Sequence, residues 1–179
     1  MEKLFPDKEI MLNTRPTNIT EEQERELCIK FATEIIKSGW SSDDIEDVAK
    51  DLSNICPDYN GFQAAKSLED SSNEANYSID SEFVDYLDYF NHSRENLLIK
   101  NIKDWVSVFD IKPKFNKGDN LFIEKSLNYH LPKDSTIFII GINKEQAHYY
   151  LHKNRDSTSG QVVTFEEVES KCKIHTNEN

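Results

Sequence analysis

The spacing of apolar residues changes at Pro113, and this change constrains the fold more than any other feature of the chain. Between residues 20 and 110, apolar side chains recur every three to four positions, which is the period of amphipathic helices. After Pro113, short runs rich in β-branched residues are separated by turn-forming residues, a pattern typical of strands. The sequence therefore predicts an α+β fold, in which an N-terminal bundle of about four to five helices precedes a small antiparallel β-meander.

Caps and breakers delimit the first two predicted helices. Thr20 and Gln23 form the pattern of a capping box, and Gly39 supplies a stop for the helix that they begin. The second helix is predicted over residues 43–55 and ends before Pro57. Each helix carries one apolar stripe, so each is expected to bury one face against the rest of the bundle.

The remaining helical segments are less sharply delimited. A short helix is predicted after Asn60, and the polar, acidic residues 69–80 are expected to form an exposed loop. Apolar side chains recur at helical spacing over residues 81–90 and again over residues 94–109. The intervening residues 91–93 are either a break between two helices or part of one bent helix.

Four short strands are expected after Pro113, and they are predicted over residues 121–127, 136–142, 147–152 and 161–165. A Gly-Asp turn, consecutive strands and a final hairpin form an arrangement that resembles the small SH3-type barrels of many adaptor and nucleic-acid-associated proteins. The resemblance covers residues 114–170 and implies an SH3-like open barrel. It is architectural, and no functional residue is carried over from it.

These patterns divide the chain into four parts. They are an irregular N-terminal arm over residues 1–19, an acidic helical domain over residues 20–110, a small antiparallel β domain over residues 114–170, and a loose tail over residues 171–179.

Negative charge is concentrated in the predicted helical part. Residues 41–90 contain thirteen Asp and Glu against two Lys, a net charge of −11. Residues 1–110 contain 24 acidic and 11 basic residues, net −13, whereas residues 111–179 contain 9 acidic and 10 basic residues, net +1. The resulting field repels phosphate and attracts basic surfaces, which argues against direct nucleic-acid binding by the helical part.

Two acidic stretches supply the candidate partner-binding residues. One lies in the second predicted helix, and the other interleaves carboxylates with tyrosines, a favourable composition for an interface because aromatic side chains anchor and charge speeds association. The candidates are Asp43, Asp44, Asp47, Asp51, Asp85, Tyr86, Asp88 and Tyr89. The alternative is that these carboxylates only solvate the helices, and acids in a first helical turn also suit the helix dipole.

The sequence contains no recognisable motif for catalysis or for binding a phosphate or cofactor. It has no Gly-x-Ser-x-Gly elbow, no Ser-x-x-Lys, no Walker loop and no Gly-x-Gly-x-x-Gly. His148 and His152 lie on a predicted strand, where four positions span roughly 13 Å at about 3.3 Å per residue, too far to share a metal ion. We therefore expect no enzyme, no metal site and no cofactor, unless His130 converges with these two histidines in one cleft.

The sequence also favours a cytoplasmic location. The N-terminal residues show no secretory signal, and the longest strongly apolar stretch, Ile137–Ile142, is too short to cross a bilayer. Cys28, Cys56 and Cys172 are odd in number and widely spaced, which favours reduced thiols.

Two hypotheses of different class follow. The first is a small, cytoplasmic, bacterial-type protein without enzymatic activity that binds and masks a basic partner, as immunity proteins and antitoxins mask nuclease toxins; mimicry of nucleic acid is one form that this hypothesis includes. The second is an adaptor whose small β-barrel binds a peptide or a nucleic-acid end, with the helical part as a scaffold. Its ligand surface would involve Phe115, Tyr129, Tyr149 or Tyr150. The sequence leaves the identity of the partner and the oligomeric state open.

Overall fold

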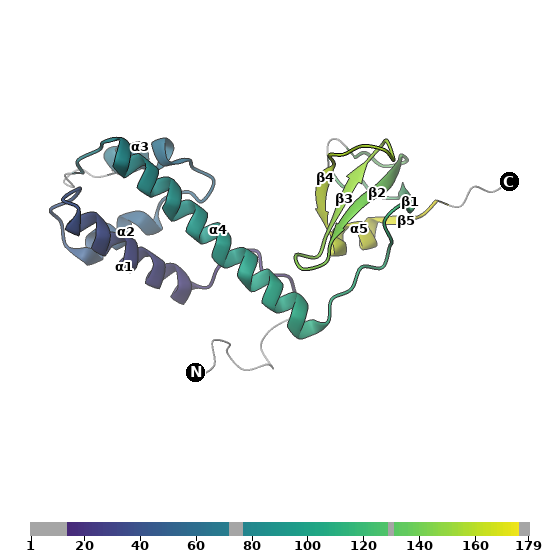
Figure 1. Cartoon of the computed structure of the whole chain (residues 1–179), viewed down its shortest axis with the longest axis horizontal. Coiled ribbons are helices and arrows are strands. Elements are labelled where there is room, and N and C mark those ends of the chain that lie inside the picture. Colours follow the sequence, from purple (N-terminus) through teal and green to yellow (C-terminus); the bar gives the residue numbers. More distant parts are fainter. Residues whose placement is uncertain (1–13, 72–76, 129–130, 176–179) are drawn as a thin grey trace. The chain divides into compact units, whose positions relative to one another are not determined.

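A computed structural model describes residues 14–71, 77–128 and 131–175 of the chain (Figure 1). Helices occupy the first part and a five-stranded antiparallel sheet follows, so the predicted α+β fold is confirmed. The chain forms two compact units. The helical unit is Pro16–Asn101, and the β unit comprises the residues from Ile102 onward together with Arg15.

The helical unit is built from α1 (Glu21–Lys37), α2 (Ile45–Ser53), α3 (Gly61–Ser71) and the N-terminal part of α4 (Ser81–Phe109). The predicted capping box is formed, because the Thr20 hydroxyl accepts from the backbone N–H of Gln23 and the Gln23 side chain accepts from the backbone N–H of Thr20. Residues 91–93 are helical, so the two helical stretches predicted around them form the single helix α4.

One apolar core joins the four helices. Figure 1 shows α1, α2 and α3 along the N-terminal part of α4. Each helix contributes side chains that are buried almost completely, and among the largest are Phe31, Leu52, Leu68, Phe83 and Phe90. The apolar stripes read from the sequence therefore face one another, and burial of such side chains is the main force that holds this unit together.

The β unit contains β1 (Asn120–Ile123), β2 (Thr136–Asn143), β3 (His148–His152), β4 (Gln161–Thr164), α5 (Phe165–Lys171) and β5 (Cys172–Ile174). The strand order is β4-β3-β2-β1-β5, with every neighbouring pair antiparallel. Strands β4 and β5 lie at the two edges, and the sheet is not closed. The meander predicted from the sequence is thus formed by β1 to β4.

The C-terminal part of the β unit differs from the sequence prediction. Residues 172–174, expected in a loose tail, form β5, in which Cys172 is buried and pairs with Ile123. The preceding helix α5 was not predicted. Its Thr164 cap accepts from the backbone N–H of Glu167, and its apolar residue Val168 is buried in the core of the sheet. The strand predicted over residues 121–127 ends at Ile123. Residues 176–179 of the expected tail lie outside the described residues.

Tyr149 lies at the centre of the β unit and is fully buried. Its hydroxyl accepts from the backbone N–H of Phe115 at 3.0 Å and donates to Glu169 Oε1 at 3.0 Å. Burial is the first cause of the raised pKa of Tyr149, and the Glu169 carboxylate also raises it. The hydroxyl is therefore a satisfied structural group that ties the start of the sheet to α5.

No helix within the described residues is both long enough and apolar enough to cross a membrane.

Candidate functional site

Three of the predicted partner-binding carboxylates lie around Tyr77. The Tyr77 hydroxyl donates to Asp51 Oδ2 at 2.9 Å. Burial raises the pKa of Tyr77, and the hydrogen bond and charge of Asp51 and the nearby charges of Asp43 and Asp47 raise it further. Asp43 also accepts from the Ser41 hydroxyl at 3.1 Å. Asp43 and Asp51 therefore have local structural contacts.

Of the four predicted partner-binding carboxylates around α2, Asp44 and Asp47 are exposed. Asp44 is the N-cap residue of α2, but its side chain makes no capping hydrogen bond. Asp47 lies in the first helical turn, where a negative charge interacts favourably with the helix dipole. Both carboxylates face solvent, so they are available to a basic partner.

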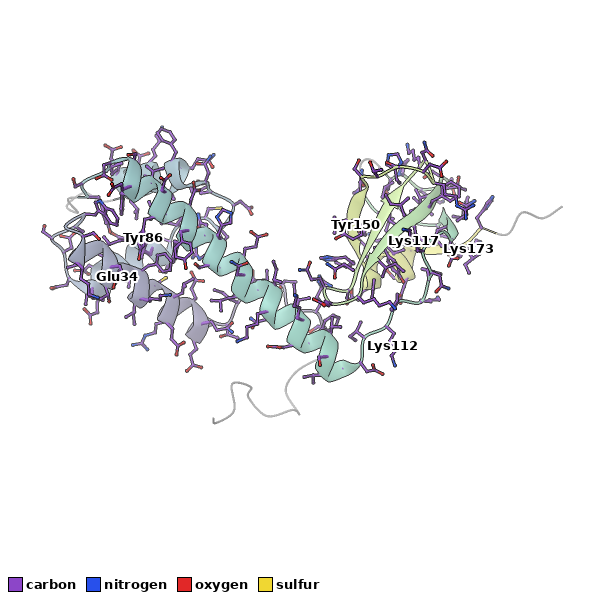
Figure 2. All side chains as sticks on the ribbon, in the orientation of Figure 1. Glu34, Tyr86, Lys112, Lys117, Tyr150 and Lys173 are labelled. Carbon is purple, nitrogen blue, oxygen red and sulfur yellow. The ribbon has the colours of Figure 1, made fainter. Side chains whose placement is uncertain are left out.

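The tyrosines of α4 pack on Phe31 of α1. The ring centroids of Tyr86 and Tyr89 lie 4.9 and 5.6 Å from that of Phe31. Tyr86 is half-buried and also contacts Trp40 (Figure 2). Burial raises the pKa of Tyr86 to about 12, and the negative charge of Glu34 contributes to this increase. Tyr89, by contrast, is 57% exposed. Tyr86 thus contributes mainly to helix packing, whereas Tyr89 presents an aromatic surface to solvent.

Asp85 and Asp88 lie one helical turn apart on α4 and differ in environment. Asp88 is half-buried, and its Oδ1 accepts from the backbone N–H of Gly61 at 2.5 Å, at the start of α3. Asp85 is exposed and lines a hollow of about 700 Å³ together with Phe62, which is 69% exposed. Asp88 therefore caps a neighbouring helix, and Asp85 remains a candidate for partner contact.

A larger groove lies within the helical unit and has a volume of about 1120 Å³. It is lined by α1, α2, the segment between α2 and α3, and the middle of α4. Six carboxylates and three basic side chains line it, a net charge of −3 with His92 neutral. The charged lining residues are Glu21, Glu24, Glu46, Asp58, Asp88, Glu95, Arg25, Lys50 and Arg94. We call this feature the acidic groove.

A buried ion pair lies in the acidic groove. The Arg94 side chain is 8% exposed, and its Nε donates to Glu24 Oε1 at 2.8 Å, while Nη2 donates to the same oxygen. Nη1 donates to the carbonyl oxygen of Ile55 at 2.8 Å, and the guanidinium lies 4.7 Å from the centroid of the Phe90 ring. This single side chain connects α4 with α1 and with the end of α2.

Asn91, beside the ion pair, is 8% exposed and also lines the acidic groove. Its amide nitrogen Nδ2 donates to the carbonyl oxygen of Tyr59 at 2.6 Å. Its Oδ1 is buried and has no hydrogen-bond partner among the described residues. A buried amide oxygen without a partner is unusual in a folded protein, and leaving this acceptor unsatisfied lowers the stability of the helical unit.

Sequence reasoning missed the acidic groove, although one signal was present. Arg94 follows Phe90 and precedes Leu98 at four-residue spacing, so a charged residue occupies the apolar side of a helix. Such a residue needs a buried partner, but Glu24 lies seventy residues away in the sequence. Cys28 of α1 is buried, and burial together with Glu24 raises its pKa to about 12, which suppresses thiolate formation.

The histidines have separate local contacts. Arg15 lies 2.6 Å from His148 Nε2 and also donates to the carbonyl oxygen of Gln146 at 2.8 Å. His152 Nδ1 accepts from the backbone N–H of Asn154. Within the described residues, no group of three or more His, Cys, Asp or Glu side chains is arranged to hold a metal ion. His130 lies outside these residues.

The stability of the β unit is expected to fall as the pH is lowered through 6.5. Burial, with an added effect of Arg15, lowers the pKa of His148 from its ordinary value of 6.5. The unfolded chain then binds a proton that the folded protein does not, so acidification favours unfolding until the folded-state pKa is passed. Urea unfolding at several pH values measures this effect. The variant His148→Gln keeps a hydrogen-bond acceptor for Arg15 but has no group that titrates in this range. If its stability depends on pH in the same way as that of the wild-type protein, His148 is not the cause of the effect.

The residues of the alternative adaptor hypothesis lie in different environments. Phe115 and Tyr149 are buried in the core of the β unit, so the expectation that they form a ligand surface is wrong for these two. Tyr150 is half-buried on the sheet (Figure 2), and Tyr129 lies outside the described residues. The described part of the β unit thus presents less aromatic surface than the sequence suggested.

Comparisons of the chain with protein-family models, with curated proteins and with solved structures find no match.

Proposed function

We propose that this chain is an acidic interaction protein, without enzymatic activity, that binds and masks a basic partner protein. The mode of action is steric and electrostatic, as in immunity proteins and antitoxins that block nuclease toxins, and the analogy is one of class. The field of the helical unit steers the partner, exposed carboxylates pair with its Lys and Arg side chains, and Tyr89 anchors the complex. We place this activity in the cytoplasm, in line with the three free cysteines.

The supporting observation is the location of the charge. The helical unit holds nineteen Asp and Glu against seven Lys and Arg, a net charge of −12, which equals the net charge of the whole chain. Asp44, Asp47 and Asp85 are exposed members of this set. A unit of this size with so large a net charge produces a potential that raises association rates with cationic surfaces and repels polyanions.

Charge reversal tests the proposal. The variant Asp44→Lys, Asp47→Lys and Asp85→Lys avoids the carboxylates that have structural contacts. Each protein is used as bait in a lysate of the source cells at about 50 mM salt. The wild-type protein should retain a basic partner and this variant should not, and the retained partner should be released at about 500 mM salt. With the purified partner, the association rate constant should fall at least about tenfold for the variant, because steering depends on long-range charge.

The matched control reverses three exposed carboxylates of the β unit, Glu145, Asp156 and Glu166, and changes the net charge of the chain by the same amount. This control should retain the partner. Capture that is indifferent both to salt and to reversal in the helical unit would contradict the proposal. Equal losses in the two variants would show that net charge alone, and not the helical surface, governs binding.

A further inference from the structure

We propose that Arg15 and His148 form a pH-dependent latch, which holds the Arg15 segment of the N-terminal arm on the β unit at neutral pH and releases it when His148 is protonated. The latch consists of the Arg15 side chain and the three residues that it contacts, Gln146, Ala147 and His148. It lies within the β unit, so it goes beyond the proposed function and does not depend on partner binding.

Arg15 contacts the β unit at the turn between β2 and β3. Its Nη2 donates to the carbonyl oxygen of Gln146 at 2.8 Å, and its Nη1 donates to that of Ala147 at 3.3 Å. Nη2 also lies 2.6 Å from Nε2 of His148, the first residue of β3. These contacts join positions that are 131 to 133 residues apart, so they are tertiary contacts that hold this segment against the sheet.

The contact between Arg15 and His148 requires a neutral imidazole. A guanidinium offers only N–H donors and stays protonated in proteins. His148 Nε2 must therefore be the acceptor, which is possible only while that nitrogen carries no proton. Protonation would convert the hydrogen bond into a contact between two cations. The closed latch and the charged imidazole thus exclude each other.

The elements packed beside His148 offer little compensation for a second positive charge. The residues opposite His148 on β2 and β4 are Asn143 and Thr164, which carry no charge. The negative charge of Glu166 on α5 acts on Arg15, but this carboxylate is exposed, so solvent and salt screen it. Repulsion between the two cations should therefore be relieved by movement of Arg15.

The turn that precedes His148 does not change this balance. Lys144 is exposed and adds a positive charge, whereas Glu145 is paired with Lys103 at 2.8 Å. Burial, with an added effect of Arg15, lowers the pKa of His148, which agrees with a folded state that keeps the imidazole neutral.

Linkage sets the expected pH dependence of the latch. The released imidazole should titrate near its ordinary pKa of 6.5, whereas the pKa of the latched imidazole is lower. Between these two values, the ratio of latched to released protein should fall about tenfold for each unit of decrease in pH. The latch is therefore closed at neutral pH and opens in acid.

The first test follows the full-length protein by NMR from about pH 7.5 to about pH 5, the range in which an imidazole changes charge. The heteronuclear NOE of the Arg15 amide should fall with the same midpoint as the titration of the His148 ring. The amides of Leu121 and Ile123 in β1 should keep their native chemical shifts, which distinguishes release from unfolding. An Arg15 signal that does not change as His148 titrates, or loss of the β1 signals at the same pH, would overturn the proposal.

The second test compares three glutamine variants. His148→Gln keeps an acceptor that does not titrate, so Arg15 should stay latched at about pH 5, whereas the control His92→Gln in the helical unit should release it as the wild-type protein does. Arg15→Gln removes the cation, so the pKa of His148 should rise towards 6.5.

Two results of the second test contradict the latch. They are release of Arg15 in acid despite His148→Gln, and a pKa of His148 that is unchanged by Arg15→Gln. If His148→Gln does not fold, Arg15→Gln decides the question, because Arg15 lies outside the strands and helices. None of these measurements involves a partner, so failure of the latch leaves the proposed function intact.

Discussion

Arg94→Ala is expected to destabilise the helical unit by roughly 3 kcal/mol, because it removes a buried guanidinium that connects three segments and leaves the partly buried Glu24 carboxylate without its partner. Arg94 makes two hydrogen bonds to Glu24 and one to the carbonyl oxygen of Ile55, and its guanidinium packs on Phe90. All four contacts are lost together. Urea denaturation followed by Trp40 fluorescence measures the change, in a Trp105→Phe background that removes the tryptophan of the β unit.

Two further variants separate the ion pair from packing. Arg94→Lys keeps the charge but not the planar fork, so its cost should be intermediate. The double variant Glu24→Gln with Arg94→Met removes both charges and retains much of the volume, so it should be more stable than Arg94→Ala. A double variant that is as unstable as Arg94→Ala would show that lost packing, and not the unpaired charge, explains the effect.

The features that the sequence predicted well depend on neighbouring residues. The capping box of Thr20 and Gln23 is complete within one turn of α1, so its pattern is sufficient to locate the start of that helix. The change of hydrophobic period at Pro113 likewise separates helices from strands without information about tertiary contacts. Short elements were harder to predict from the sequence. Strand β5 has three residues, and its burial depends on pairing with β1, about fifty residues earlier.

The candidate site shows the same dependence on distance along the chain. Acidic charge is visible in composition, but the sequence does not show which carboxylates are already engaged by the fold. Asp51 bonds to Tyr77 and Asp88 to Gly61, contacts that span 26 and 27 residues. The acidic groove is assembled from three helices, and the missing partner of Asn91 Oδ1 is a property of that assembly. Neither the groove nor the unpaired oxygen of Asn91 can be recognised from a local sequence pattern.

Gly61→Ala is expected to destabilise the helical unit by about 2–3 kcal/mol, because α3 approaches the backbone of α4 too closely for a side chain. A Cβ at residue 61 would overlap the carbonyl oxygen of Val84 and lie 3.0 Å from Cγ of Asp88. Relief of this overlap requires α3 to move away from α4, which also stretches the hydrogen bond from the Gly61 N–H to Asp88. Chemical denaturation and hydrogen exchange of the α3 amides measure the loss.

Gly39→Ala is the matched control in the same unit. Gly39 has a φ of 75° with no atom within 4 Å of the position of its Cβ, so the substitution introduces backbone strain alone, about 1 kcal/mol. The larger loss should therefore occur at Gly61, with reduced protection concentrated in α3. If Gly39→Ala proves the more damaging change, close approach of α3 and α4 does not limit stability.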